Sequence, residues 1–142
     1  MSMKKLLFLL LFLAGFSLLF KACDSDDDNG PEPGNEIEIT IVSPHDGEVI
    51  PMAEAEEVDI YVMIEATDEN HDIDIEVFLE DEPGDKIADW HLHRHVALIE
   101  FNEPLDLSSF EAGTKFRIEV TACIDHDCDE YEHSQSHFSV GE

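Results

Sequence analysis

Three histidines alternate with other residues in the segment Trp90-His91-Leu92-His93-Arg94-His95. In a β-strand this spacing places His91, His93 and His95 on one face, with neighbours about 6.5 to 7 Å apart along the strand. Two imidazoles at that distance can ligate one ion, and neutral imidazole nitrogen suits zinc and copper. The segment therefore predicts a site for a divalent transition metal, with zinc or copper as the cofactor.

Further ligands must come from neighbouring strands or loops, because one strand supplies only part of a coordination sphere. The chain has eight histidines, all after residue 44, and four of them are candidates to complete the site: His71, His126, His133 and His137. His133 and His137 have the parity of one strand face, so they are also candidates to cluster with each other. The alternative is that these histidines are polar residues of exposed strand faces and bind no metal.

A calcium site is a weaker prediction, made from the run Asp68-Glu69-Asn70-His71-Asp72-Ile73-Asp74. Acid or amide oxygens occur at every second residue of this run, and calcium takes six to eight oxygen ligands. The run has neither the glycine nor the distal glutamate of an EF-hand loop. Acidic residues make up a quarter of the chain, so such clusters are expected by chance.

Cys123 and Cys128 flank a four-residue segment with the composition of a hairpin loop. In an exported protein two such cysteines are expected to form a disulfide, which here closes a short ring and stabilises less than a long-range bridge. A metal site formed by these cysteines with His126 is the rival interpretation.

The search for enzyme motifs is mostly negative. The sequence has no Gly-x-Ser-x-Gly, no His-Glu-x-x-His and no glycine-rich phosphate loop. Trp90 is a candidate platform for a sugar ring, but a single tryptophan in a sandwich is more often part of the core. We therefore expect a binding protein rather than an enzyme.

The elements that position these residues are expected to be strands. Apolar residues alternate with polar ones along most of the chain after Glu36, which is the period of a strand and not of a helix. Turns are expected at residues 43–47, 82–85 and 112–113, and a short helix is a possibility only at Leu105 to Phe110. Strands are expected at residues 37–41, 58–66, 73–79, 116–124 and 133–140, with two more within 87–101. About seven short strands predict an all-β, antiparallel β-sandwich.

Charge excludes one class of partner. The chain has 35 acidic and 7 basic residues, and residues 23–142 hold all the acids and four of the basic residues, which gives 4 − 35 = −31. Nucleic-acid affinity comes largely from Lys and Arg, so this chain is not expected to bind nucleic acid. The same sign argument disfavours direct binding to an anionic membrane surface.

The first 22 residues have the pattern of a signal peptide. A basic segment, Met1 to Lys5, precedes fifteen uncharged and mostly apolar residues, Leu6 to Phe20, which is short for a membrane span. Ala22-Cys23 follows and resembles a bacterial lipobox, in which the cysteine is lipidated and becomes the new N-terminus; Lys21 departs from that pattern. The resemblance implies residues 1–22 as a lipoprotein signal peptide, lipidation at Cys23 and attachment to a membrane through the lipid.

Residues 23–35 are acidic and rich in Gly and Pro, which predicts a disordered tether. The acidic run Asp24-Ser25-Asp26-Asp27-Asp28 directly after the cysteine resembles the surface-export signal of Bacteroidota lipoproteins. That resemblance implies a protein anchored in the outer membrane and facing the cell exterior.

Residues 36–141 are expected to be one domain. Ile39-Thr40-Ile41-Val42-Ser43-Pro44-His45-Asp46-Gly47 resembles the first strand and turn of bacterial Ig-like domains. Glu65-Ala66-Thr67-Asp68 and Ile118-Glu119-Val120-Thr121-Ala122 resemble two of their later strands. The chain as a whole resembles uncharacterised Bacteroidota lipoproteins with a single His-rich Ig-like domain.

Two functions are consistent with these observations. The first is a surface lipoprotein that binds zinc or copper through its histidines. The second is a structural or adhesive Ig-like module that binds a protein or a glycan, in which the histidines have no special role.

Overall fold

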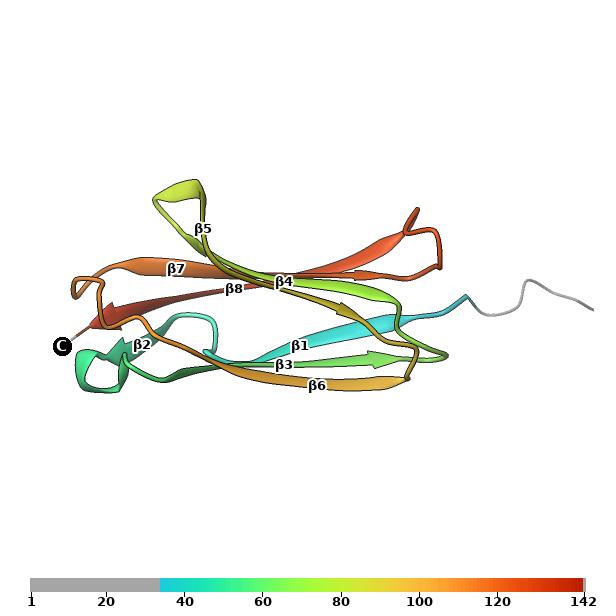
Figure 1. Ribbon diagram of the computed structural model, residues 1–142, viewed down its shortest axis with the longest axis horizontal. Coiled ribbons are helices and arrows are strands. Elements are labelled where there is room, and N and C mark those ends of the chain that lie inside the picture. Colours follow the sequence, from blue (N-terminus) through green and yellow to red (C-terminus); the bar gives the residue numbers. More distant parts are fainter. Residues whose placement is uncertain (1–33, 142) are drawn as a thin grey trace, which may run out of the picture. The chain divides into compact units, whose positions relative to one another are not determined.

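The computed structural model describes residues 34–141, and these residues are mostly β-strand (Figure 1). The strands are β1 (Ile37–Ser43), β2 (Glu48–Pro51), β3 (Val58–Ala66), β4 (Asp72–Leu79), β5 (Glu82–His93), β6 (Leu98–Leu105), β7 (Lys115–Cys123) and β8 (Tyr131–Gly141). One 3₁₀ turn, η1 (Met52–Glu54), follows β2. The predicted signal peptide, Cys23 and the tether up to residue 33 lie outside the described residues.

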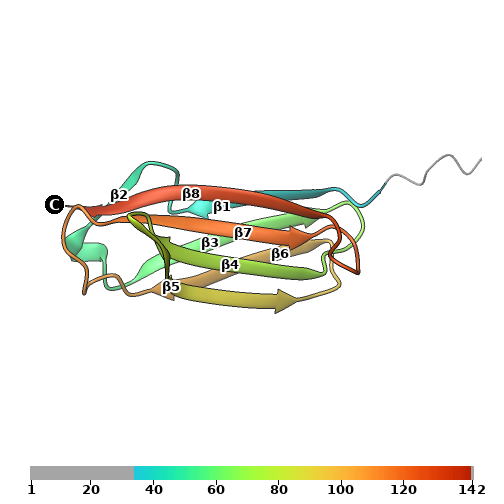
Figure 2. The same cartoon turned by 90° about the horizontal axis from the view of Figure 1, so that it is seen from above.

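The strands form two sheets that pack face to face (Figures 1 and 2). A three-stranded sheet has the order β1-β3-β6, and a five-stranded sheet has the order β2-β8-β7-β4-β5. All neighbouring strands are antiparallel except β2 and β8, which are parallel. The predicted all-β sandwich is confirmed.

The core lies between the two sheets and follows from the alternation in the sequence. In β3 every second side chain is buried, and β4 and β7 show the same pattern from the opposite sheet. Fully buried Ile and Val side chains each contribute about 1.5–3 kcal/mol through the apolar area they remove from water. Within the described residues, the buried apolar side chains lie between Ile37 and Val140. A chain that begins at Asp24 therefore contains this core.

Two sequence-based expectations differ from the structure at the β4–β5 hairpin and after β6. Residues 82–85 were expected to be a turn, but the turn is at Glu80 and Asp81, and β5 already begins at Glu82. Register shifts near Phe78 lengthen this hairpin, and its tip bends away from the sandwich in Figure 1. Residues 106–110 form a turn and not a helix, because the Asp106 carboxylate accepts bonds from the amide and hydroxyl of Ser108.

Strand β2 was not expected from the sequence. It has only four residues, and its partner β8 is more than eighty residues away in the chain. The other strands agree with the predicted ones to within a few residues at their ends. No helix in residues 34–141 has the length and apolar character needed to cross a membrane.

Candidate metal centre

Three loops meet at the end of the sandwich where β1 begins, on the right of Figure 1. They are residues 67–71 between β3 and β4, residues 94–97 between β5 and β6, and residues 124–130 between β7 and β8. The rings of His71, His95 and His126, one from each loop, have centroids 5.0 to 6.2 Å apart. Histidines far apart in the sequence are thus gathered at one end of the fold.

Asn70 fixes the first two loops to each other. Its side chain is fully buried, and the amide nitrogen donates to the carbonyls of Val96 at 2.8 Å and Ala97 at 3.2 Å. The Asn70 backbone N–H also donates to Val96, and the Arg94 N–H donates to the carbonyl of His71. The positions of His71 and His95 are therefore set by hydrogen bonds made by their neighbours.

Asn35 fixes the first loop to the third. Its amide nitrogen donates to the carbonyls of Glu69 at 2.7 Å and Ile124 at 3.1 Å, and its oxygen accepts from the Asp68 N–H at 3.1 Å. Asn35 was assigned to the tether, but these bonds join it to the two loops that carry Glu69 and His126.

The sequence predicted that His91, His93 and His95 share one strand face. In the structure His95 does not share the face of His91 and His93. Strand β5 ends at His93, because the bonds from Asn70 draw the following loop across the end of the sandwich. His91 and His93 do lie on one face of β5, on the outside of the five-stranded sheet. His95 instead turns back toward His71.

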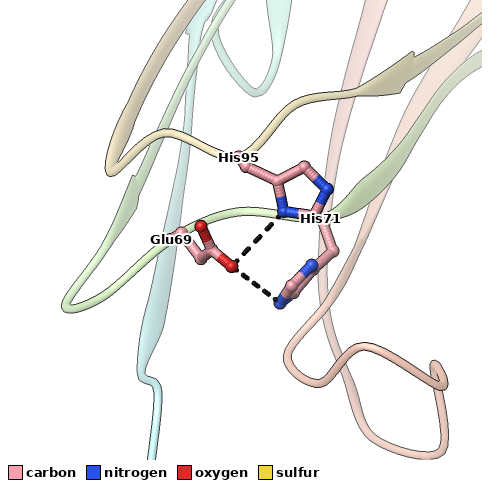
Figure 3. Close-up of side chains that lie close together, drawn as sticks. All are labelled: Glu69, His71 and His95. Atoms are coloured by element: carbon pink, nitrogen blue, oxygen red, sulfur yellow. Dashed lines mark hydrogen bonds and ion pairs between the residues drawn. The ribbon is translucent and has the colours of Figure 1, made fainter.

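The ligand atoms of Glu69, His71 and His95 converge (Figure 3); we call these three residues the inner cluster. The Glu69 Oε1 atom lies 3.3 Å from His95 Nδ1 and 3.9 Å from His71 Nε2, and all three ligand atoms lie within 4.8 Å of one another. Two ligands bound at 2.0–2.1 Å to a tetrahedral ion are about 3.3 Å apart. The first distance already matches a zinc site, and the second needs a small side-chain rotation.

His71 is the most buried member of the inner cluster, with 11% of its side chain exposed. Its Nδ1 atom is buried and has no hydrogen-bond partner within the described part of the chain. The ring of His126 lies beside that of His71 with centroids 5.3 Å apart, so His126 is the nearest candidate for a fourth ligand. Within the described residues, His71 Nδ1 therefore has no hydrogen bond, and Nε2 has only the Glu69 carboxylate at 3.9 Å.

His93 connects the inner cluster to β4. Its Nε2 atom faces the Nε2 atom of His95 at 3.2 Å, and its Nδ1 atom lies 2.7 Å from the Asp72 carboxylate. If His93 and His95 each donate a proton from Nδ1 to their carboxylates, the two Nε2 lone pairs face each other. An ion on His95 Nδ1 removes this conflict, because His95 can then donate from Nε2 to His93, which donates from Nδ1 to Asp72. Metal-bound histidines commonly donate their second N–H in this way.

His91 lies between two carboxylates of β4; we call Asp72, Asp74 and His91 the outer cluster. Its Nδ1 atom is 2.8 Å from Asp74 and its Nε2 atom is 3.4 Å from Asp72. The hydrogen bond with Asp74 raises the pKa of His91 above 6.5, against a smaller opposing effect of desolvation. The hydrogen bond from His93 lowers the pKa of Asp72 below 3.8.

Cys123 and Cys128 form a disulfide, which confirms the structural interpretation of this pair. Asp72 approaches both sulfurs, but sulfur atoms joined to each other have no proton to donate and are not thiolate ligands. The disulfide closes the loop that carries His126. Cys128 has a φ of 55°, a left-handed conformation unusual for a residue other than glycine.

The structure separates His133 and His137 from the other candidates. Both point outward on β8, where four residues of strand span about 13 Å, so they cannot share an ion. His133 is exposed and lies opposite Thr121. His137 lies beside Glu80, with its Nδ1 atom 3.5 Å from the Glu80 carboxylate. Among the described residues, neither ring pairs with those of His71, His93, His95 and His126, which lie next to one another.

The oxygens of the predicted calcium run are divided among separate places. Asn70 points into the protein, Glu69 joins the inner cluster, and Asp72 and Asp74 lie on the outer face of β4. These oxygens do not converge on one point, and a calcium site in this run stays a prediction. The alternating Asp72 and Asp74 face the alternating His93 and His91 across one hairpin, and this complementary spacing was the signal that could have paired them.

Trp90 packs at the open side of the sandwich, between β5 and β6. It is half-buried against the core, and its ring meets that of Phe101 edge-on with centroids 5.2 Å apart. A groove of about 490 Å³ lies here, with Asp89, Glu100 and Glu103 among its lining residues.

A scan against models of known protein families gives no match, and a comparison with curated proteins gives none either. The functional proposal below is therefore argued from the residues of the inner and outer clusters.

Proposed function

We propose that this protein binds a divalent transition metal, zinc or copper, at the inner cluster. The observation that carries the proposal is the convergence of Glu69, His71 and His95, whose ligand atoms all lie within 4.8 Å of one another. One carboxylate and two imidazoles form a donor set typical of zinc sites that keep a coordination position open. Such a set suits capture, buffering or delivery of the metal.

A titration with zinc and with copper, on the chain that begins at Asp24, tests the proposal. We expect His95→Gln to weaken the tightest binding step at least tenfold while the circular-dichroism spectrum stays unchanged, because the His95 side chain is 42% exposed. His133→Gln is the matched control, since it removes an exposed histidine of β8 that lies outside both clusters. Binding of the His95 variant with wild-type affinity, or wild-type binding no tighter than free histidine, would overturn the proposal.

We also propose that the protein is an exported lipoprotein held in the outer membrane by a lipid on Cys23 and facing the cell exterior. The support is the sequence alone: the apolar segment that ends at Ala22-Cys23 and the acidic run that follows. A chain this acidic has little affinity of its own for a membrane, and lipidation supplies it.

Expression in a bacterium that lipidates proteins tests the anchor. We expect Cys23→Ala to abolish incorporation of a labelled fatty acid and to release the chain from membranes, while Ser25→Ala keeps both. Replacing the aspartates of residues 24–28 with asparagine is expected to keep the lipid but to protect the domain from protease added to intact cells. An unlipidated wild-type chain contradicts this proposal and leaves the metal proposal intact.

A second candidate function is that of an adhesive module for a protein or a glycan, and the groove beside Trp90 is the observation that favours it. The aromatic floor suits an apolar or sugar face, and the acidic rim suits hydroxyl or cationic groups. Glycan and peptide arrays probed with wild type and with Asn102→Ala plus Glu103→Ala test it. We expect any true groove ligand to lose binding in the variant and to be insensitive to a chelator.

A further inference from the structure

His91 faces two acceptors with its two ring nitrogens. The Nδ1 atom is 2.8 Å from the Asp74 carboxylate, and the Nε2 atom is 3.4 Å from the Asp72 carboxylate. A neutral imidazole has one N–H, so it can donate to one of these carboxylates only. In this neutral form, which is the form that ligates metals, the other nitrogen directs a lone pair at an anionic oxygen, and a cation between the two atoms makes that arrangement favourable.

We infer that His91 Nε2 and the Asp72 carboxylate hold a second divalent transition-metal ion, with Asp74 accepting the Nδ1–H of His91 and fixing its ring. The 3.4 Å between the two ligand atoms is close to the separation of about 3.3 Å on a tetrahedral ion with bonds of 2.0–2.1 Å. A carboxylate that accepts the second N–H of a metal-bound histidine is a recurrent feature of such sites. One imidazole and one carboxylate with water in the other positions suit zinc, the probe chosen below.

This outer ion is distinct from the one at the inner cluster. The His91 side chain is 58% exposed, whereas that of His71 is 11% exposed. Contacts of 2.7 Å from Asp72 to His93 and 3.2 Å from His93 to His95 connect the two clusters. The outer ion therefore exchanges with solvent more readily and lies on a continuous path of ligand atoms toward the inner one.

Counting zinc ions per chain by native mass spectrometry, at increasing zinc, tests the inference on the chain that begins at Asp24. We expect two ions for wild type, one for His91→Gln, one for His95→Gln and none for the double variant. His133→Gln, the matched control on the same sheet face, is expected to keep two. Asp74→Asn keeps the ligands but removes their orienting acceptor, and we expect it to weaken the outer ion about 10- to 100-fold.

The expected ion at the inner cluster rests on the proposed function, whereas the ion at the outer cluster is the inference made here. The experiment distinguishes failure of one from failure of the other. One ion in wild type that is kept by His91→Gln and lost by His95→Gln overturns the outer ion only. One ion that is lost by His91→Gln and kept by His95→Gln overturns the proposed function and supports the outer ion. Two ions in both single variants overturn the assignment of either ion to these residues.

Discussion

At the scale of single residues, the histidines of this protein differ in how many of their nitrogens the protein itself satisfies. His91 has a carboxylate at each nitrogen, and His93 has a carboxylate at one and another imidazole at the other. His71 has a buried nitrogen with no partner among the described residues. A buried polar atom without a hydrogen bond costs about 1–3 kcal/mol, so this nitrogen, Nδ1, is the least satisfied one on the three rings.

The titration of His91 gives the first prediction. Asp74 raises its pKa, so in zinc-free protein we expect the midpoint of the His91 ring signals in NMR to lie above 6.5. Asp74→Asn should move that midpoint down toward 6.5. Because the folded-state pKa is raised, this contact stabilises the fold fully below pH 6.5, and its contribution is lost as the pH rises through the folded-state pKa. A wild-type midpoint at or below 6.5 contradicts the contact.

At the scale of elements, two asparagine side chains hold the site together. Asn70 joins the β3–β4 loop to the β5–β6 loop, and Asn35 joins the β3–β4 loop to the β7–β8 loop. Loops at the end of a sandwich are otherwise its most mobile part. These bonds keep the ligands near one another without a metal, which lowers the entropy lost when an ion binds.

Asn70→Ala is predicted to lower the free energy of unfolding by about 2 kcal/mol, since two hydrogen bonds of a fully buried side chain are lost. Urea unfolding measures this. Asn102→Ala is the control: Asn102 is exposed on β6, so we expect a change within about 0.5 kcal/mol. Equal stability of the two variants would show that Asn70 does not fix the loops.

The disulfide belongs to this scale because it shapes a single loop. Replacing both Cys123 and Cys128 with serine is expected to lower the free energy of unfolding by about 2 kcal/mol, the chain-entropy value for so short a ring. We also expect faster amide exchange in residues 124–130 and unchanged exchange in β3. A global loss of exchange protection contradicts a local role for the bond.

All strands except β2 could be predicted from the sequence, whereas the site could be predicted only in part. Alternation is a local property, and it located β3, β4 and β7 almost to the residue. The meeting of His71, His95 and His126 depends on which loops share an end of the sandwich, and no local pattern contains that. Asn70 looked like one oxygen donor among many, and its role appears only once its burial is known.

At the scale of the whole molecule, negative charge opposes pairing of the sheet edges with other chains. Strands β1, β5, β6 and β2 lie at the edges of the two sheets, and unpaired edges are prone to join another chain. Residues 23–142 have a net charge of −31, and exposed acids such as Glu38 and Glu100 lie on edge strands. Repulsion between copies therefore opposes pairing at neutral pH.

We predict that the protein stays monomeric at pH 7 and begins to associate as the pH falls toward its isoelectric point, about 4.2. Protonation of the carboxylates removes the repulsion before the core is affected. Light scattering against pH, with circular dichroism recorded in parallel, measures this. Raising the salt concentration should move the pH at which association begins upward, because salt screens the charges. A constant particle size down to pH 4.2 contradicts the charge argument.

The bonds made by Asn35 also bear on the proposed lipid anchor. Asn35 is joined to the same loops that carry Glu69 and His126, so the polypeptide emerges from the domain beside the histidines. Eleven residues lie between Cys23 and Asn35, and even fully extended they would reach at most about 43 Å. If Cys23 is lipidated as proposed, this length of chain limits how far the domain can move from the lipid surface.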